Sequence, residues 1–333
     1  EPYLARTLNG CASGAAALVR AEIAFSRCEF DEAEQMSMRA FNDAGRHKQY
    51  HIAMRALYYV ARIGLHKGSY ETVQDALGQM ELIKSAMRPN ACQYDCATGF
   101  IYSVLGMVDN VPAWLKSDFS FSVAPRLLRG FENIARVRYW LAVKDYHQLL
   151  AFLDARIKGH DDGFLFGSIS ARALMAVALY RTGQRERAFA LLNEAYELSA
   201  PNDIKLPFVD LANDMRTLTA AAQKAVARGE TKLPPLAWLK EINRRSATYA
   251  RKLTFVARKF NEREGKGPKV RLTQREQKIL NGLGHGMSRS EIAADFGISQ
   301  NTVKAAIRII YDKLGAQTLG DAVRIGERYG ILD

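Results

Sequence analysis

The sequence predicts an all-α protein in which a long series of helical repeats precedes a small four-helix domain. Two observations carry this prediction. Alanine-rich amphipathic stretches alternate with short polar breaks over the first two thirds of the chain, and three helix-start signals follow one another near its end. No segment alternates apolar and polar residues between hairpin turns, so we expect no β-strands. We divide the chain into residues 1–230, 231–269 and 270–333.

The composition is that of a globular protein. Hydrophobic residues make up 48% of the 333 positions and charged residues 25%, which excludes a disordered or collagen-like chain. No apolar run approaches the roughly 18 residues of a membrane-spanning helix, so we expect no such helix. We expect no membrane among the partners. Four scattered cysteines favour a reducing compartment, and we expect a cytoplasmic protein. The chain opens at Glu1 without an initiator Met, so we expect it to continue upstream.

The positive charge is concentrated in one segment. The formal net charge is +12. Residues 232–271 contain 12 basic and 3 acidic residues, whereas residues 272–333 contain 8 and 7 and the first 230 contain 27 and 25. A basic segment between two nearly neutral blocks makes a polyanion a plausible partner, but it does not choose between nucleic acid and a membrane surface.

A turn pattern recurs through residues 1–230. Each copy has a turn residue, an aromatic or apolar residue two positions later, and a small or apolar residue three positions after that. The copies are Cys28-Glu29-Phe30 with Ala33, Gly68-Ser69-Tyr70 with Val73, a degenerate Asp109-Asn110-Val111 with Trp114, Lys144-Asp145-Tyr146 with Leu149, and Gly183-Gln184-Arg185 with Ala188. A helix–turn–helix unit that recurs at a near-constant interval predicts a solenoid of helical hairpins.

The turn resembles that of the tetratricopeptide repeat, which often reads Gly-Asp-Tyr-x-x-Ala. The resemblance implies an α-solenoid in which the aromatic residue wedges between paired helices and the small residue lets them approach. The intervals between the copies are longer than the usual period of that repeat. An irregular helical bundle is the alternative.

Residues 231–269 predict one long basic helix and a hinge. After Pro234-Pro235 a helix is expected from Leu236 to Glu264, ending before a hinge at 265–268. Its apolar stripe steps by three and four residues through Leu239, Ile242, Ser246, Tyr249, Leu253, Val256 and Phe260. We expect this stripe to cap the last repeat near residues 206–218; a coiled coil and a membrane surface are the alternatives.

Three N-caps organise the C-terminal block. Thr273 with Glu276 and Ser288 with Glu291 form capping boxes, and Ser299 is a third cap. They predict helices over 274–284, 289–296 and 300–314, and a fourth follows over 319–329. A tight turn through Gly297 between the second and third is the helix-turn-helix layout, in which Ala293 marks the closest approach.

This block closely resembles the DNA-binding domain of the LuxR family of bacterial transcription regulators. The resemblance begins at Leu272 and covers nearly the whole of that domain. Its motifs stand in order at the family spacing: Leu272-Thr273-x-Arg275-Glu276, Ile292-Ala293, Ile298-Ser299-x-x-Thr302-Val303-Lys304 and Lys313-Leu314-Gly315. One departure is Ala306, where the family commonly has His.

The resemblance implies double-stranded DNA as the partner. The third helix would enter the major groove, with Lys304, Ala305 and Arg308 toward base edges and with Thr302 and Arg289 near phosphates. A homodimer on two half-sites, formed through the fourth helix, would be the binding form. The alternative is a helical bundle that uses the same residues only as caps and core.

A LuxR-type domain behind helical repeats resembles the MalT-like regulators, whose solenoid binds an inducer. The resemblance implies a small-molecule or peptide inducer on the concave face. Residues at groove positions of the repeats, with aromatic and guanidinium groups suited to an anionic or aromatic ligand, are Arg55, Tyr58, Arg62, His66, Phe131 and Arg138. The alternative is a solenoid that docks a protein partner.

Other chemistry has little support in the sequence. There is no Gly-x-x-x-x-Gly-Lys-Ser/Thr phosphate loop, no arrangement of nucleophile and base stands out, and we expect neither an enzyme nor a cofactor in this chain. His47 with His51, and Cys92 with Cys96, have the spacing of a zinc half-site on a helix. Neither pair has further ligands at metal spacing, so we expect no metal.

Overall fold

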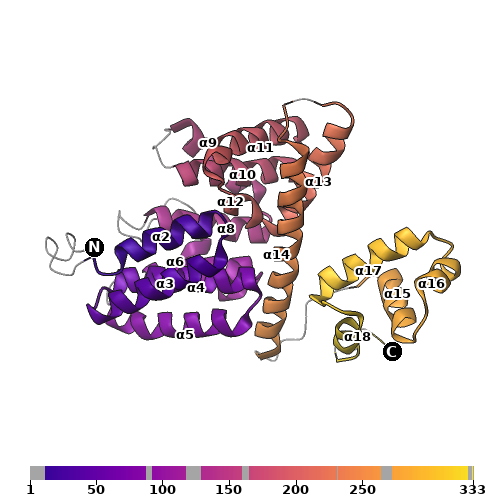
Figure 1. Cartoon of the computed structure of the whole chain (residues 1–333), viewed down its shortest axis with the longest axis horizontal. Helices are drawn as coiled ribbons and strands as arrows, with labels where there is room; N and C mark the ends of the chain where they lie inside the picture. The colour runs from indigo at the N-terminus through magenta and orange to yellow at the C-terminus, as the bar shows by residue number, and fades with distance from the viewer. Residues whose placement is uncertain are drawn as a thin grey trace. The chain divides into compact units, whose positions relative to one another are not determined.

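Figure 1 shows a computed structural model of the chain. It describes residues 12–87, 92–117, 129–159, 165–230, 232–263, 272–328 and 332. All regular elements in these ranges are helices, which confirms the predicted all-α fold. The chain forms two compact units, Glu1–Tyr249 and Ala250–Asp333, and each is described by itself. None of the described helices has the length and apolar character needed to cross a bilayer.

The first unit is a succession of helices, most of them 12 to 18 residues long. In order these are α2 (Ala15–Ser26), α3 (Phe30–Arg46), α4 (Tyr50–Lys67), α5 (Tyr70–Ala86), α6 (Cys92–Val104), η1 (Val108–Asn110), α7 (Ala113–Lys116), α8 (Arg129–Val143), α9 (Tyr146–Gly159), α10 (Leu165–Arg181), α11 (Arg185–Ser199), η3 (Ala200–Asn202), α12 (Leu206–Val209), α13 (Ala212–Ala227) and the first part of α14 (Leu236–Arg263). Neighbours pack as α2 on α3, α4 on α5, α6 on α8 and α10 on α11 (Figure 1).

Four predicted turns join paired helices as expected. Their turn residues, Cys28, Gly68, Lys144 and Gly183, have left-handed φ angles of 64°, 78°, 62° and 84°. In each turn the next amide donates back to the helix, as Ser69 does to the Gly64 carbonyl at 2.9 Å. The side chains five residues after each turn residue are fully buried: Ala33, Val73, Leu149 and Ala188. The turn therefore lets each second helix pack closely on the first.

The predicted third copy, at Asp109 with Trp114, is wrong. The left-handed residue of this turn is Gly106, with φ 71°, and Met107 donates to the Tyr102 carbonyl at 2.8 Å. The small buried residue is Val111. No aromatic residue follows this turn, and the 3-10 helix η1 stands where a long helix would begin. For these reasons the sequence pattern places the turn residue three positions too late, at Asp109 instead of Gly106. With Gly106 in place of Asp109, the spacing of the five turn residues along the chain becomes nearly uniform. Their assignment to the tetratricopeptide family stays a prediction.

The first part of α14 packs on α12 and α13, whereas Leu253, Val256 and Phe260, the rest of the stripe expected to cap the last repeat, belong to the second unit. Leu239, Ile242, Ser246 and Tyr249 are buried. Asn243 Nδ2 donates to the Arg216 carbonyl at 2.7 Å. Trp238 packs edge-on against Phe208 of α12, and Gln223 of α13 reaches the Leu239 carbonyl. The predicted hinge at 265–268 lies outside the described residues.

The second unit contains the four predicted helices: α15 (Gln274–Gly284), α16 (Arg289–Asp295), α17 (Gln300–Leu314) and α18 (Leu319–Arg328). Both capping boxes are formed, and Ser299 Oγ accepts from the Thr302 amide. Its buried core includes Leu272, Ile279, Leu280, Leu283, Ile292, Ala293, Val303, Ile307, Ile310, Leu314, Ala316, Ala322 and Ile325. Phe296 and Ile298 are partly buried and pack against this core.

Candidate functional site

Helix α17 has one buried and one exposed face. Val303, Ile307, Ile310 and Leu314 are buried, at the spacing of one helix face. The other face is exposed and carries four of the predicted DNA-binding residues, Thr302, Lys304, Ala305 and Arg308; the fifth, Arg289, is exposed at the start of α16. The geometry therefore leaves these side chains accessible, while their contacts with DNA stay predictions.

A glycine turn sets α17 against α16. Gly297 has φ 60°, and the following amide, that of Ile298, donates to the Ala293 carbonyl at 2.9 Å. Gln300 Nε2 at the start of α17 donates to Ser290 Oγ of α16 at 2.8 Å. Ala293 is buried, as its predicted place at the close approach requires.

Several of the shared motif residues hold the domain together rather than face solvent. Glu276 completes the first capping box and also accepts from Lys313 Nζ of α17 at 2.6 Å. Partial burial acts to raise the pKa of Glu276, but the hydrogen bonds from Lys313 and Thr273 outweigh it and lower the pKa below its usual value. Two segments of the motif, 37 residues apart, thus form one ion pair.

The cap at Ser288 gives a testable prediction for α16. Replacing Ser288 by alanine removes the acceptor for the Glu291 amide and should destabilise the start of α16 by about 1 kcal/mol. In the full-length chain, hydrogen exchange of the α16 amides should then be roughly fivefold faster. Ser288→Thr retains the acceptor and serves as the control. Equal exchange in both variants would mean that the cap does not stabilise this helix.

The predicted ligand-binding residues come together in the first unit, with one exception. Tyr58, Arg62 and His66 lie on α4, and Phe131 and Arg138 lie on α8. The Tyr58 and Phe131 rings are 4.9 Å apart, edge to face. Arg55, in contrast, lies apart from this group, is more than half exposed and pairs with Glu22 at 2.9 Å.

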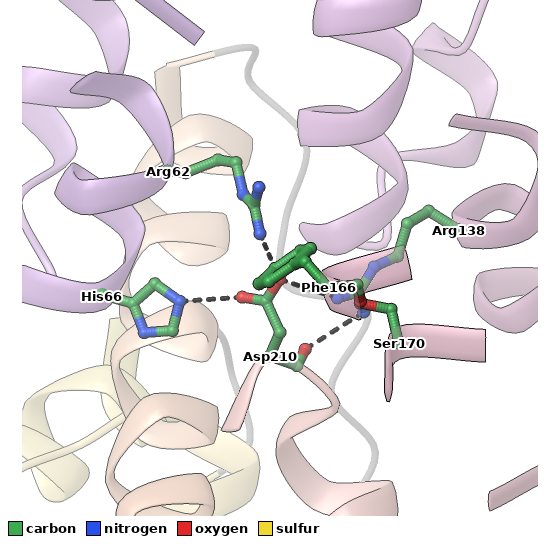
Figure 2. A network of polar contacts seen from close by, with 6 residues as sticks. All are labelled: Arg62, His66, Arg138, Phe166, Ser170 and Asp210. Atoms are coloured by element: carbon green, nitrogen blue, oxygen red, sulfur yellow. Dashed lines mark hydrogen bonds and ion pairs between the residues drawn. The ribbon is translucent and has the colours of Figure 1, made fainter. Parts of the chain in front are cut away.

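The centre of the group is Asp210, a residue that the sequence patterns did not indicate (Figure 2). Asp210 follows α12. Its Oδ2 accepts from Arg62 Nη2 and from Arg138 Nη2, the latter at 2.9 Å, and its Oδ1 lies 2.8 Å from His66 Nε2. Arg138 Nη1 also donates to the Asp210 carbonyl at 3.1 Å. We call Arg62, His66, Arg138 and Asp210 the Asp210 cluster.

Aromatic rings enclose the Asp210 cluster. The guanidinium carbon of Arg62 lies 4.7 Å from the Phe25 ring centre and 4.8 Å from that of Phe100. His66 is stacked between Phe30, at 4.6 Å, and Tyr249 of α14, at 3.8 Å. The cluster therefore joins α4 and α8 to the residue that follows α12, and the Tyr249 ring adds α14, all within the first unit.

Burial and charge fix the ionisation of Asp210. Only 6% of its side chain is exposed. Burial acts to raise its pKa, but the charges of Arg62 and Arg138 and the hydrogen bond with His66 hold the pKa of Asp210 well below its usual range. The predicted ligand groups are thus buried around an internal carboxylate instead of lining an open groove, and their contact with a ligand stays a prediction.

The zinc half-sites gain no further ligands. Among the described residues no group of three or more His, Cys, Asp or Glu side chains is placed to hold a metal ion. His51 Nδ1 lies 2.7 Å from Gln93 Oε1, and Cys92 and Cys96 are free thiols. Burial raises the pKa of both thiols, which keeps them protonated at neutral pH.

The fold of the second unit and the exposed face of α17 define a helix-turn-helix domain. Comparison with known proteins gives its family: residues 270–325 match the bacterial regulatory proteins of the luxR family, so the C-terminal part of the chain forms a luxR-family domain. This confirms the resemblance to LuxR regulators for that domain. The resemblance to MalT-like regulators stays a prediction.

Three relatives are named transcriptional regulatory proteins. YdfI of Bacillus subtilis is 40% identical over 63 residues, covering 19% of this chain and 30% of that protein. The probable regulator SgaR of Hyphomicrobium methylovorum is 43% identical over 58 residues, 17% and 28% of the two chains. FixJ of Bradyrhizobium diazoefficiens is 26% identical over 180 residues, 54% and 73% of the two chains. The chain spans less than a third of the first two relatives. No solved structure matches the chain.

Proposed function

We propose that the protein is a transcription regulator that binds double-stranded DNA through α17 and senses an inducer with its helical repeats. The observation that carries the first part is the exposed face of α17, with Lys304 and Arg308 one turn apart over a buried core, in a luxR-family domain. The names of the relatives support the same role.

Charge supports a contribution from α14 to DNA affinity. Residues 272–333 are nearly neutral, although phosphate neutralisation supplies much of the affinity of DNA-binding proteins. The basic residues Lys240, Arg244 and Arg251 of α14 are exposed. A homodimer, formed through α18, would double the number of basic side chains on the duplex; Leu319 at the start of α18 is partly exposed and available for such a contact.

The test of DNA reading is the loss of sequence discrimination. Lys304→Ala and Arg308→Ala should each weaken binding to a duplex selected by the wild-type chain by about 1–3 kcal/mol, since bidentate base contacts contribute that much. Fluorescence anisotropy on the selected duplex and on a random duplex measures both. Lys278→Ala, which removes an exposed charge from α15, is the control. If a variant weakens binding to the selected and the random duplex equally, its residue contacts phosphate and the assignment to base edges is wrong.

The alternative, a repeat region that docks a protein, is favoured by an exposed apolar pair. Val19 and Ile23 lie one turn apart on α2 and are 53% and 49% exposed. Inducer sensing and docking differ in what alters DNA binding by the purified chain. If a small molecule alone alters DNA binding, the result supports sensing. If the change in DNA binding needs a stoichiometric protein, and Ile23→Asp abolishes binding of that protein, the result supports docking.

A further inference from the structure

The Asp210 cluster has the donors of an anion site. Two guanidinium groups and an imidazole converge on one carboxylate, and the Arg62, Arg138 and Asp210 side chains are 9%, 11% and 6% exposed. Glu22, a second carboxylate whose charge interacts with Arg62, is already paired with Arg55. Planar guanidinium groups match a carboxylate in geometry as well as charge.

One donor of the cluster lacks an acceptor. Arg62 Nε is buried and has no hydrogen-bond partner among the residues that the structure describes. A buried charged donor without an acceptor carries a desolvation cost, and native structures rarely retain one without a reason. Nε belongs to the guanidinium group whose Nη2 donates to Asp210 Oδ2, and a carboxylate that is not tethered to the chain can turn to face Nη2 and Nε together.

The backbone is strained just after Asp210. Two residues later, Ala212 has φ 47°, a left-handed conformation that residues with a Cβ rarely adopt. Ala212 begins α13, and α13 holds α14 through the bonds from Asn243 to Arg216 and Thr219. Ion pairs from α4 and α8 thus fix the junction of α12 and α13, and release of Asp210 frees that junction to relax.

We propose that Asp210 is an internal ligand of a carboxylate-binding site formed by Arg62, His66 and Arg138, and that a small organic carboxylate binds by replacing it. The inference rests on the proposed sensing function, whose ligand class it names. Replacement satisfies Arg62 Nε and detaches the α12–α13 junction from α4 and α8. Because Asp210 competes from within the chain, the wild-type protein binds such ligands more weakly than the bare site would.

Chemical rescue in the full chain tests the site. In Asp210→Ala the site is emptied, and acetate is the part of the aspartate side chain that has been removed. Sodium acetate replaces sodium chloride at constant ionic strength, and acetamide is the neutral probe of the same shape. All three tryptophans lie in the first unit, so their fluorescence reports its thermal midpoint alone. Asp214→Ala is the control, since Asp214 pairs with the part-exposed Arg181.

The rise in thermal midpoint that acetate produces should be about three times larger in Asp210→Ala than in the wild type, because a ligand stabilises the state that binds it. Asp214→Ala should behave as the wild type, and acetamide should have no such effect. Asp210→Asn carries the same test if the alanine variant does not fold. Equal shifts in all chains, or equal rescue by acetamide, would overturn the site.

A second measurement separates the site from the sensing function. Acetate, but not acetamide, should change the affinity of the wild-type chain for its selected duplex. Rescue without any change in DNA binding would leave the carboxylate site standing and overturn its role in sensing. A response of DNA binding to neutral ligands, without acetate rescue, would support sensing and overturn this site.

Discussion

Asp210→Asn is expected to lower the free energy of unfolding of the first unit by about 3–5 kcal/mol, the cost of breaking a buried ion pair by removing one partner. The substitution preserves the shape of the side chain but leaves Arg62 and Arg138 buried without the carboxylate that both contact. It also turns one acceptor into an NH2 donor that faces other donors. Urea unfolding followed by tryptophan fluorescence measures the loss in the first unit.

The control is an aspartate in a more exposed ion pair. Asp214 accepts from Arg181 Nε at 2.8 Å, with both side chains about a quarter to a third exposed. Asp214→Asn should cost under about 1 kcal/mol, as is usual for such pairs. Similar losses at both positions would show that the Asp210 cluster contributes no more than a surface ion pair.

The difference between wild type and Asp210→Asn also depends on pH. The folded pKa of Asp210 lies below its unfolded value of about 3.9. The stability from its charge is therefore complete above about pH 5 and decreases as the pH falls below about 4. Other carboxylates titrate in both chains and cancel, and the raised pKa values of Tyr58 and Tyr249 keep both phenols neutral. A difference that stays constant between pH 5 and pH 3 would contradict this origin.

The C-terminal domain could be predicted almost completely because its signals are local. A cap and its glutamate are three residues apart, as in Ser288 and Glu291, and the buried face of α17 follows helical spacing from Val303 onward. Such features are specified by the segment that forms them. The ion pair between Glu276 and Lys313 and the bond from Gln300 to Ser290 required the fold; for the ion pair the resemblance supplied both residues without their contact.

Only part of the Asp210 cluster could be predicted from the sequence. Helical spacing correctly placed Arg62 and His66 on one face of α4, because period alone decides which residues share a face. Their partner Asp210 is 148 and 144 residues away, in a short irregular junction with no periodicity. Spacing also grouped Arg55 with them, but Arg55 lies two turns before Arg62 on α4 and pairs with Glu22 instead.

A second buried ion pair gives the other large expected effect. Arg136 and Glu132 lie one turn apart on α8 and are 0% and 2% exposed, with Nε 2.9 Å from Oε1. Arg136 also donates to the Ser117 carbonyl and lies over the Trp114 ring. Arg136→Met retains most of the side-chain volume but removes the positive charge beside the buried Glu132 carboxylate, and the first unit should lose about 3–5 kcal/mol.

The chain contains a matched control for this prediction. Glu241 and Arg245 of α14 have the same four-residue spacing and the same 2.9 Å contact between Nε and Oε1, but both side chains are about one third exposed. Arg245→Met should cost only about 0.5 kcal/mol, since water solvates the carboxylate that remains. Both variants are followed by tryptophan fluorescence during urea unfolding, because both pairs belong to the first unit.

The double variant Glu132→Leu with Arg136→Met tests the cause of the loss. If the cost of Arg136→Met comes from a buried charge deprived of its counter-charge, removing that charge as well should restore most of the stability, because apolar residues of similar volume can replace a buried ion pair. A double variant as unstable as Arg136→Met alone would mean that the loss comes from the Ser117 and Trp114 contacts, and that the ion pair is not what stabilises α8.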